Sequence, residues 1–127
     1  MNGMFPSRIL VIEDNEDNLT LIRLLLEKEK HTVLSALDGR SGLEVARTEH
    51  PDLILLDLSM PEMDGWEVAE TLKSDIATRD IPIIAVTAHA APHDRERALA
   101  AGCDSFVVKP FSVRKLIGEI DNLLEWY

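Results

Sequence analysis

The feature that most constrains the fold is the run Leu53–Leu56, four aliphatic residues that lead directly into Asp57. A continuous apolar run of this length is typical of a strand buried on both faces, as in a parallel sheet covered by helices. Pro61 follows Asp57 by four positions and cannot continue a strand, because proline has no amide hydrogen to donate. We therefore place Asp57 at the carboxyl end of a central strand, where parallel α/β sheets bind their ligands.

The remaining chain alternates between short apolar runs and stretches whose apolar residues recur at helical spacing. Besides the central strand, strands are expected at residues 8–12, 32–36, 82–87 and within 104–109. Helices are expected from Asn15, from Gly39, from Gly65, up to Gly102 and after Ser112. Five βα units predict an α/β fold, a doubly wound five-stranded parallel sheet in the flavodoxin-like order 2-1-3-4-5. We expect residues 1–127 to form this single domain.

Small polar residues stand where helix amino termini need caps. Asp14 or Asn15 is expected to cap the first helix, Asp38 the second and Ser112 the last. Gly102 is expected to end the fourth helix, because glycine readily adopts the left-handed conformation that closes many helices.

Composition excludes several classes of protein. The 23 acidic residues outnumber the 13 basic ones and give a net charge of −10, which argues against direct binding of nucleic acid. The single cysteine, Cys103, cannot form an internal disulfide and is expected to pack as a small apolar residue. No segment approaches the roughly 20 apolar residues that span a bilayer, and no signal peptide is apparent. We expect a cytoplasmic protein without membrane insertion.

Polar side chains follow four of the predicted strands. Glu13 and Asp14 come after the first strand, Asp57 ends the third, and Thr87 and Lys109 end the fourth and fifth. Because the carboxyl ends of parallel strands meet at one edge of a sheet, we expect these side chains to share one site. Neighbouring carboxylates need a cation, and oxygen ligands suit Mg²⁺. With a lysine and a hydroxyl beside them, the site is suited to phosphoryl transfer onto Asp57 as an aspartyl-phosphate.

Taken in order, these motifs resemble the receiver domain of two-component response regulators, the family of the chemotaxis regulator CheY. The matching residues are Glu13-Asp14, Asp57 with Pro61 and Gly65, Thr87-Ala88 and Lys109-Pro110. The resemblance extends over essentially all of residues 8–125. Each motif is weak alone, whereas the ordered set at successive strand ends is specific.

By this resemblance Asp57 would be the phosphoacceptor, and Thr87 and Lys109 would bind the phosphoryl oxygens. The peptide bond between Lys109 and Pro110 would be cis. Phe106 would be the aromatic residue that turns inward when Thr87 is drawn toward the phosphoryl group.

The resemblance also implies a site for Mg²⁺ or Mn²⁺. Asp14, Asp57 and the backbone carbonyl of Ser59 would bind the ion directly, and Glu13 would act mainly through metal-bound water. The residues next to the phosphoryl group would be Ser59, Ala88 and His89.

A single-domain response regulator is the function that the resemblance implies. The phosphoryl donor would be a histidine kinase or a histidine phosphotransfer protein, and the output a downstream protein target bound through the fourth helix, fifth strand and fifth helix. Because the chain stops at Tyr127, no output domain is expected. The protein would not be an enzyme for outside substrates, although it would catalyse its own phosphotransfer and dephosphorylation.

Two other classes of function stay open. An aspartyl-phosphate phosphatase would use Asp57 as a transient nucleophile, but such sites usually carry a second acid where this chain has Ser59. A phosphate-independent, receiver-like binding module would need none of this chemistry. The intact acidic pair, Thr87 and Lys109 argue against that module.

Other polar and aromatic residues are interpreted as structural, since isolated residues of these types rarely mark a site. His31, His50 and His93 are expected to be solvated. Trp66 and Trp126 are expected to be partly exposed packing residues, and the run 94–97 a solvated helix face.

Overall fold

The computed structural model describes residues 6–60, 65–88 and 91–124, and these form ten elements that alternate between strand and helix. The strands are β1 (Arg8–Ile12), β2 (Thr32–Ala36), β3 (Leu53–Asp57), β4 (Ile83–Thr87) and β5 (Ser105–Val108). The helices are α1 (Glu16–Lys28), α2 (Gly39–Glu49), α3 (Gly65–Ser74), α4 (Pro92–Ala100) and α5 (Val113–Leu124). The predicted alternation is confirmed. β4 begins one residue later than expected, after Pro82, which has no amide hydrogen for the sheet.

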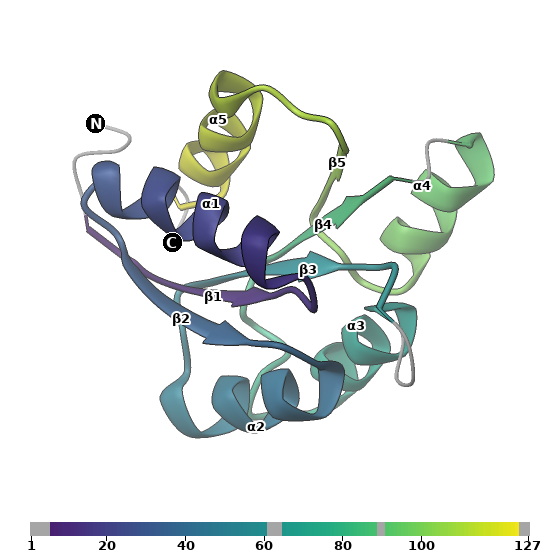
Figure 1. Cartoon of the computed structure of the whole chain (residues 1–127). Coiled ribbons are helices and arrows are strands. Elements are labelled where there is room, and N and C mark those ends of the chain that lie inside the picture. Colours follow the sequence, from purple (N-terminus) through teal and green to yellow (C-terminus); the bar gives the residue numbers. More distant parts are fainter. Residues whose placement is uncertain (1–5, 61–64, 89–90, 125–127) are drawn as a thin grey trace.

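All neighbouring strands pair in parallel, and their order is β2-β1-β3-β4-β5, as predicted (Figure 1). β1 and β3 are direct neighbours at the centre, with Ile9 opposite Leu53 and Ile12 opposite Leu56. The strand order reverses between them, which is where doubly wound sheets bind ligands. Asp57 and the residues after Ile12 therefore end side by side.

Helices cover both faces of the sheet, so every residue of β3 and β4 is buried. α1 and α5 pack on one face, around a core that includes Ile22, Leu55 and Leu116. α2, α3 and α4 contribute to the core on the other face, which includes Leu56 and Ala98. Figure 1 shows α1 and α5 together above the sheet and α2 and α3 below it. Each fully buried leucine or isoleucine contributes about 1.5–3 kcal/mol to this packing.

The predicted helix ends are confirmed by hydrogen bonds. The side chains of Asn15, Asp38 and Ser112 accept hydrogen bonds from backbone amides of α1, α2 and α5 at 2.9, 2.7 and 3.0 Å. Gly102, just after α4, has a φ of 101°, in the left-handed region that favours glycine. The caps satisfy amides that helical hydrogen bonding leaves unpaired.

Two structural interpretations are wrong. His31 is only 4% exposed rather than solvated, because its ring lies beneath the entry to β1, where Nδ1 accepts a hydrogen bond from the Ser7 amide at 3.2 Å. Burial lowers the pKa of His31. Trp66 is 8% exposed and belongs to the core rather than the surface. Trp126 lies outside the described residues.

Two further expectations hold. Cys103 is buried as a small apolar residue, and burial raises the pKa of its thiol to about 12. Among the described residues, no helix is both long enough and apolar enough to cross a membrane.

Substitution of Gly65 tests how closely the start of α3 packs against the end of β3. A Cβ at this position would lie 2.4 Å from the Leu58 Cα and 2.5 Å from the Asp57 carbonyl oxygen. Because backbone atoms cannot easily yield, we expect Gly65→Ala to lower the free energy of unfolding by about 1–3 kcal/mol in urea denaturation.

Gly118 in α5 provides the matched control, since a Cβ there meets no atom within 4 Å. Gly118→Ala should raise the free energy of unfolding by about 0.5–1 kcal/mol, the gain in helix propensity. A destabilised Gly118→Ala, or an unchanged Gly65→Ala, would contradict this account of the packing.

Candidate functional site

Three carboxylates converge at the carboxyl edge of the sheet, as predicted. Asp57, the last residue of β3, is 6% exposed, and Glu13, just after β1, is 2% exposed. Asp14 is exposed beside them. Each of the three offers an oxygen, and these oxygens all lie within 4.8 Å of one another. The central position of β1 and β3 produces this convergence of residues far apart in the sequence.

Lys109 reaches this cluster from the end of β5. Its Nζ donates a hydrogen bond to Glu13 Oε1 at 3.0 Å and lies 3.7 Å from Asp57 Oδ2. The Lys109 amide donates to the carbonyl oxygen of Thr87 at 2.7 Å, which fixes the lysine against the end of β4. The peptide bond between Lys109 and Pro110 is cis, as the resemblance implied. The ammonium thus offsets part of the negative charge.

The second oxygen of Asp57 is held by the connection that follows β3. Asp57 Oδ1 accepts a hydrogen bond from the Ser59 amide at 2.9 Å. Ser59 Oγ lies 3.4 Å from Thr87 Oγ1, so the two hydroxyls face each other beside the carboxylate. Thr87 is fully buried. The predicted hydroxyl therefore lies on the side of β4 that faces Asp57.

Glu13 carries the strongest electrostatic signature of the site. The pKa of Glu13 is raised to about 7, chiefly by burial and then by neighbouring Asp57, while the hydrogen bonds from Lys109 and the Asn15 amide oppose the rise. The Asn15 amide donates to Glu13 Oε2 at 3.1 Å. Burial thus makes the charged form of Glu13 costly, the second carboxyl group beside it adds to that cost, and Lys109 offsets part of it.

These donors fit a hard divalent cation. All three side chains supply oxygen, and hard cations such as Mg²⁺ prefer carboxylate and carbonyl oxygens. A cation bound there would offset the cost of ionised carboxylates in this buried site, a cost that the raised pKa of Glu13 reflects. The chemistry of the donor set therefore agrees with the metal expected from the sequence.

The remaining predicted residues lie at varied distances from the carboxylates. Ala88 is exposed directly after β4. Phe106 is 7% exposed and packs in the α2-α3-α4 core, opposite Ala85 in the sheet register. The role of Phe106 as a switch stays a prediction. His89 and Pro61 lie outside the described residues.

The sequence analysis used Gly65 only as a sign of the family resemblance and did not predict why this position requires glycine. The absence of a side chain lets α3 begin against the Asp57 carbonyl oxygen. It also missed the stack between Arg97 and Trp66, whose ring centre lies 4.3 Å from the guanidinium carbon. Neither contact has a local pattern in the sequence that would have revealed it.

Comparison with protein families agrees with this geometry. A family model described as the response regulator receiver domain matches residues 9–121. This chain belongs to that family. The carboxyl-edge cluster is thus the acidic site of a receiver domain, and the chain is a receiver of the two-component response regulator class.

Relatives of this receiver share most of its length. The polar-differentiation response regulator DivK of Brucella ovis is 42% identical over 116 residues, covering 91% of this chain and 94% of the relative. DivK of Brucella anthropi is 41% identical over 119 residues, covering 94% of this chain and 97% of the relative.

Solved receiver structures share the fold. The receiver domain of the sensor histidine kinase PA1611 from Pseudomonas aeruginosa PAO1 is 31% identical, with a TM-score of 0.88, over 95% of this chain and 99% of its own. That structure has a magnesium ion coordinated in its active site cleft. A receiver domain of a histidine kinase from Syntrophus aciditrophicus is 32% identical, with a TM-score of 0.88, over 94% and 91% of the chains.

The raised pKa of the buried Glu13 predicts a pH-dependent stability. Between about pH 4.5 and 7 the folded state binds more protons than the unfolded state, so raising the pH through this window costs stability. Glu13→Gln removes the cost and should raise the free energy of unfolding at pH 8, without added metal, by roughly 1–3 kcal/mol.

The same substitution should change stability much less at pH 5, where folded Glu13 is protonated. Thermal melts of both proteins at the two pH values measure the difference. An equal effect at pH 5 and pH 8 would show that the raised pKa of Glu13 is not the cause.

Proposed function

We propose that Asp57 is the phosphoacceptor of this receiver and that its phosphorylation changes the binding of a partner protein. The position of Lys109 carries the proposal, because its Nζ lies 3.7 Å from Asp57 Oδ2. An ammonium at this distance neutralises charge on a group attached to that oxygen. The buried Thr87 hydroxyl on the neighbouring strand supplies a second donor.

The donor in this proposal is a phosphohistidine of a histidine kinase or histidine phosphotransfer protein. A carboxylate oxygen of Asp57 attacks phosphorus, and the phosphorus–nitrogen bond breaks with its electron pair on the departing imidazole. Lys109 and Thr87 donate hydrogen bonds to phosphoryl oxygens. Dephosphorylation is attack of water on the same phosphorus, which returns the Asp57 carboxylate and releases inorganic phosphate.

Glu13, Asp14 and Asp57 would hold Mg²⁺ or Mn²⁺, with the backbone carbonyl of Ser59 as a further oxygen ligand. When bound, such an ion neutralises charge on phosphoryl oxygens. Two observations support this assignment: the three clustered carboxylates of this chain and the magnesium ion in the PA1611 receiver domain.

Signalling would follow from the position of Thr87. A hydroxyl that donates to the phosphoryl group ties the end of β4 to Asp57, and Phe106 packs in the core below α4. We propose that the target binds the face formed by α4, β5 and α5. Ser59, Ala88 and His89 are proposed to border the phosphoryl group and to set its lifetime.

We propose that the protein acts as a switch and not as an enzyme for outside substrates. Its chemistry is confined to its own Asp57, and it would act in the cytoplasm. The names of the DivK relatives, which are response regulators of polar differentiation, support a regulatory role.

The direct test is phosphorylation by acetyl phosphate with Mg²⁺, followed by intact mass spectrometry. We expect a labile gain of one phosphoryl group that requires Mg²⁺ and disappears in Asp57→Asn. Asp80→Asn is the matched control, because Asp80 is an exposed carboxylate away from the site, and it should retain the gain.

Beryllofluoride, a stable phosphoryl analogue, separates the failures. Binding of the analogue without a covalent adduct would indicate rapid hydrolysis or a strict need for a kinase, and it would retain the switch. Absence of both adduct and analogue binding would refute the proposal and favour a phosphate-independent binding module.

A further inference from the structure

α4 is held to the rest of the receiver by few side chains. Ala98 is its only buried residue, and Ala91, which precedes it, forms no side-chain cap. The contact between the side chains of His93 and Asp94 stays within the helix. Between described residues, one polar or ring contact links a side chain of α4 to another element, the stack of Arg97 on Trp66 at 4.3 Å.

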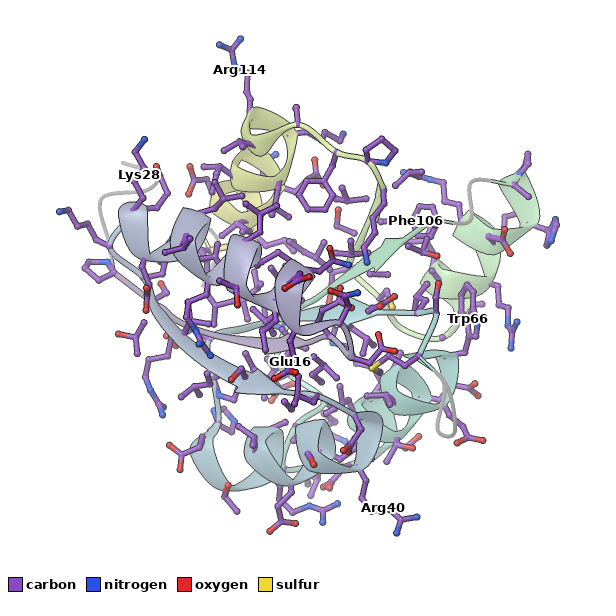
Figure 2. All side chains as sticks on the ribbon, viewed as in Figure 1. Glu16, Lys28, Arg40, Trp66, Phe106 and Arg114 are labelled. Atoms are coloured by element: carbon purple, nitrogen blue, oxygen red, sulfur yellow. The ribbon has the colours of Figure 1, made fainter. Side chains whose placement is uncertain are left out.

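Trp66 is the buried partner in this contact. It lies in the first turn of α3 and is 8% exposed, in the same buried cluster as Leu58, Met60 and Phe106. Leu58 and Met60 belong to the connection that follows the phosphoacceptor. Figure 2 shows Trp66 between the ribbons of α3 and α4. The indole is therefore fixed relative to Asp57, and Arg97 on α4 is the exposed partner.

Arg97, the other partner in the contact, lies on the helix that follows β4 and its terminal residue Thr87. Thr87 is the last residue of β4, and α4 begins at Pro92, so only four residues of the sequence separate Thr87 from α4. The stack thus connects α3, which follows Asp57 in the chain, to α4, which follows Thr87. We expect a change at either strand end to alter the geometry between Arg97 and Trp66.

We propose that the stack of Arg97 on Trp66 stabilises α4 in the arrangement that phosphorylation favours. This inference rests on the proposed function. In the structure that contains the stack, Thr87 Oγ1 lies 3.4 Å from Ser59 Oγ, on the side of Asp57, where it can donate to a phosphoryl group. Phe106 is buried in the same core as Ala98 of α4.

Reciprocity then fixes the sign of the effect. A contact that stabilises the phosphoryl-binding arrangement strengthens phosphoryl binding by the same factor, and its loss weakens binding equally. A partly exposed cation–π contact corresponds to about a two- to five-fold change in an equilibrium constant. The regulation of the site thus includes a residue that touches neither metal nor phosphoryl group.

The experiment measures the affinity for beryllofluoride with Mg²⁺, followed by fluorine-19 NMR of the bound analogue. We expect Arg97→Ala to weaken binding about two- to five-fold and Arg97→Lys, which keeps a cation, to weaken it less. Arg95→Ala is the matched control, because Arg95 is exposed on the same helix, and it should bind like the unmodified protein. Urea denaturation of each variant verifies that folding is retained.

A double-mutant cycle distinguishes the contact from general effects on α4. Trp66→Leu should weaken analogue binding by itself, and Arg97→Ala should add nothing in that background. In Trp126→Phe, where Trp66 is the single tryptophan, emission should change as the analogue binds. That change should be absent when Arg97→Ala is added.

The two proposals fail in different ways. If the unmodified protein binds the analogue and Arg97→Ala binds equally well, the inference about the stack is overturned and the proposed function stands. Additive effects of Arg97→Ala and Trp66→Leu would also overturn it. If the unmodified protein binds no analogue, the proposed function fails and the inference falls with it.

Discussion

The functional end of the receiver depends on the burial of two carboxyl groups side by side at neighbouring strand ends. Glu13 and Asp57 are both nearly inaccessible to water, yet one ammonium, that of Lys109, contacts them both. Burial, together with neighbouring Asp57, raises the pKa of Glu13. A site with unneutralised negative charge has a built-in affinity for cations.

Burial of apolar residues elsewhere in the sheet offsets the free-energy cost of this arrangement. β3 and β4 are buried along their whole length, with helices packed on both faces. That packing holds the ends of the strands in fixed positions, so the carboxylates cannot separate to relieve their repulsion. α4 differs from this scaffold because a single residue, Ala98, anchors it in the core. An element with so little buried surface is the one that a modest free energy can move.

Much of the fold could be predicted because its signals are local. The apolar run before Asp57, the caps at Asn15, Asp38 and Ser112 and the glycine at 102 each determine their own segment, and the structure confirms them. The predicted site residues within the described part also lie where the strand ends place them. Their roles in phosphoryl transfer are a separate matter of chemistry, which the geometry supports.

Contacts between distant segments could not be predicted in the same way. His31 is buried because the entry to β1 covers it, and Trp66 is buried because α3 and α4 enclose it. From the sequence, Arg97 is interpreted as part of a solvated run of charged residues. In the tertiary structure it lies over an aromatic ring.

By itself, then, the sequence determined the order of elements, the sheet and the chemical types gathered at its carboxyl edge, since hydrophobic periodicity and strand ends are encoded locally. Only the tertiary structure decided the distances among Glu13, Asp57 and Lys109 and the attachment of α4 through Arg97. Those depend on how helices pack across the sheet, and packing is a property of residues that are remote in the chain.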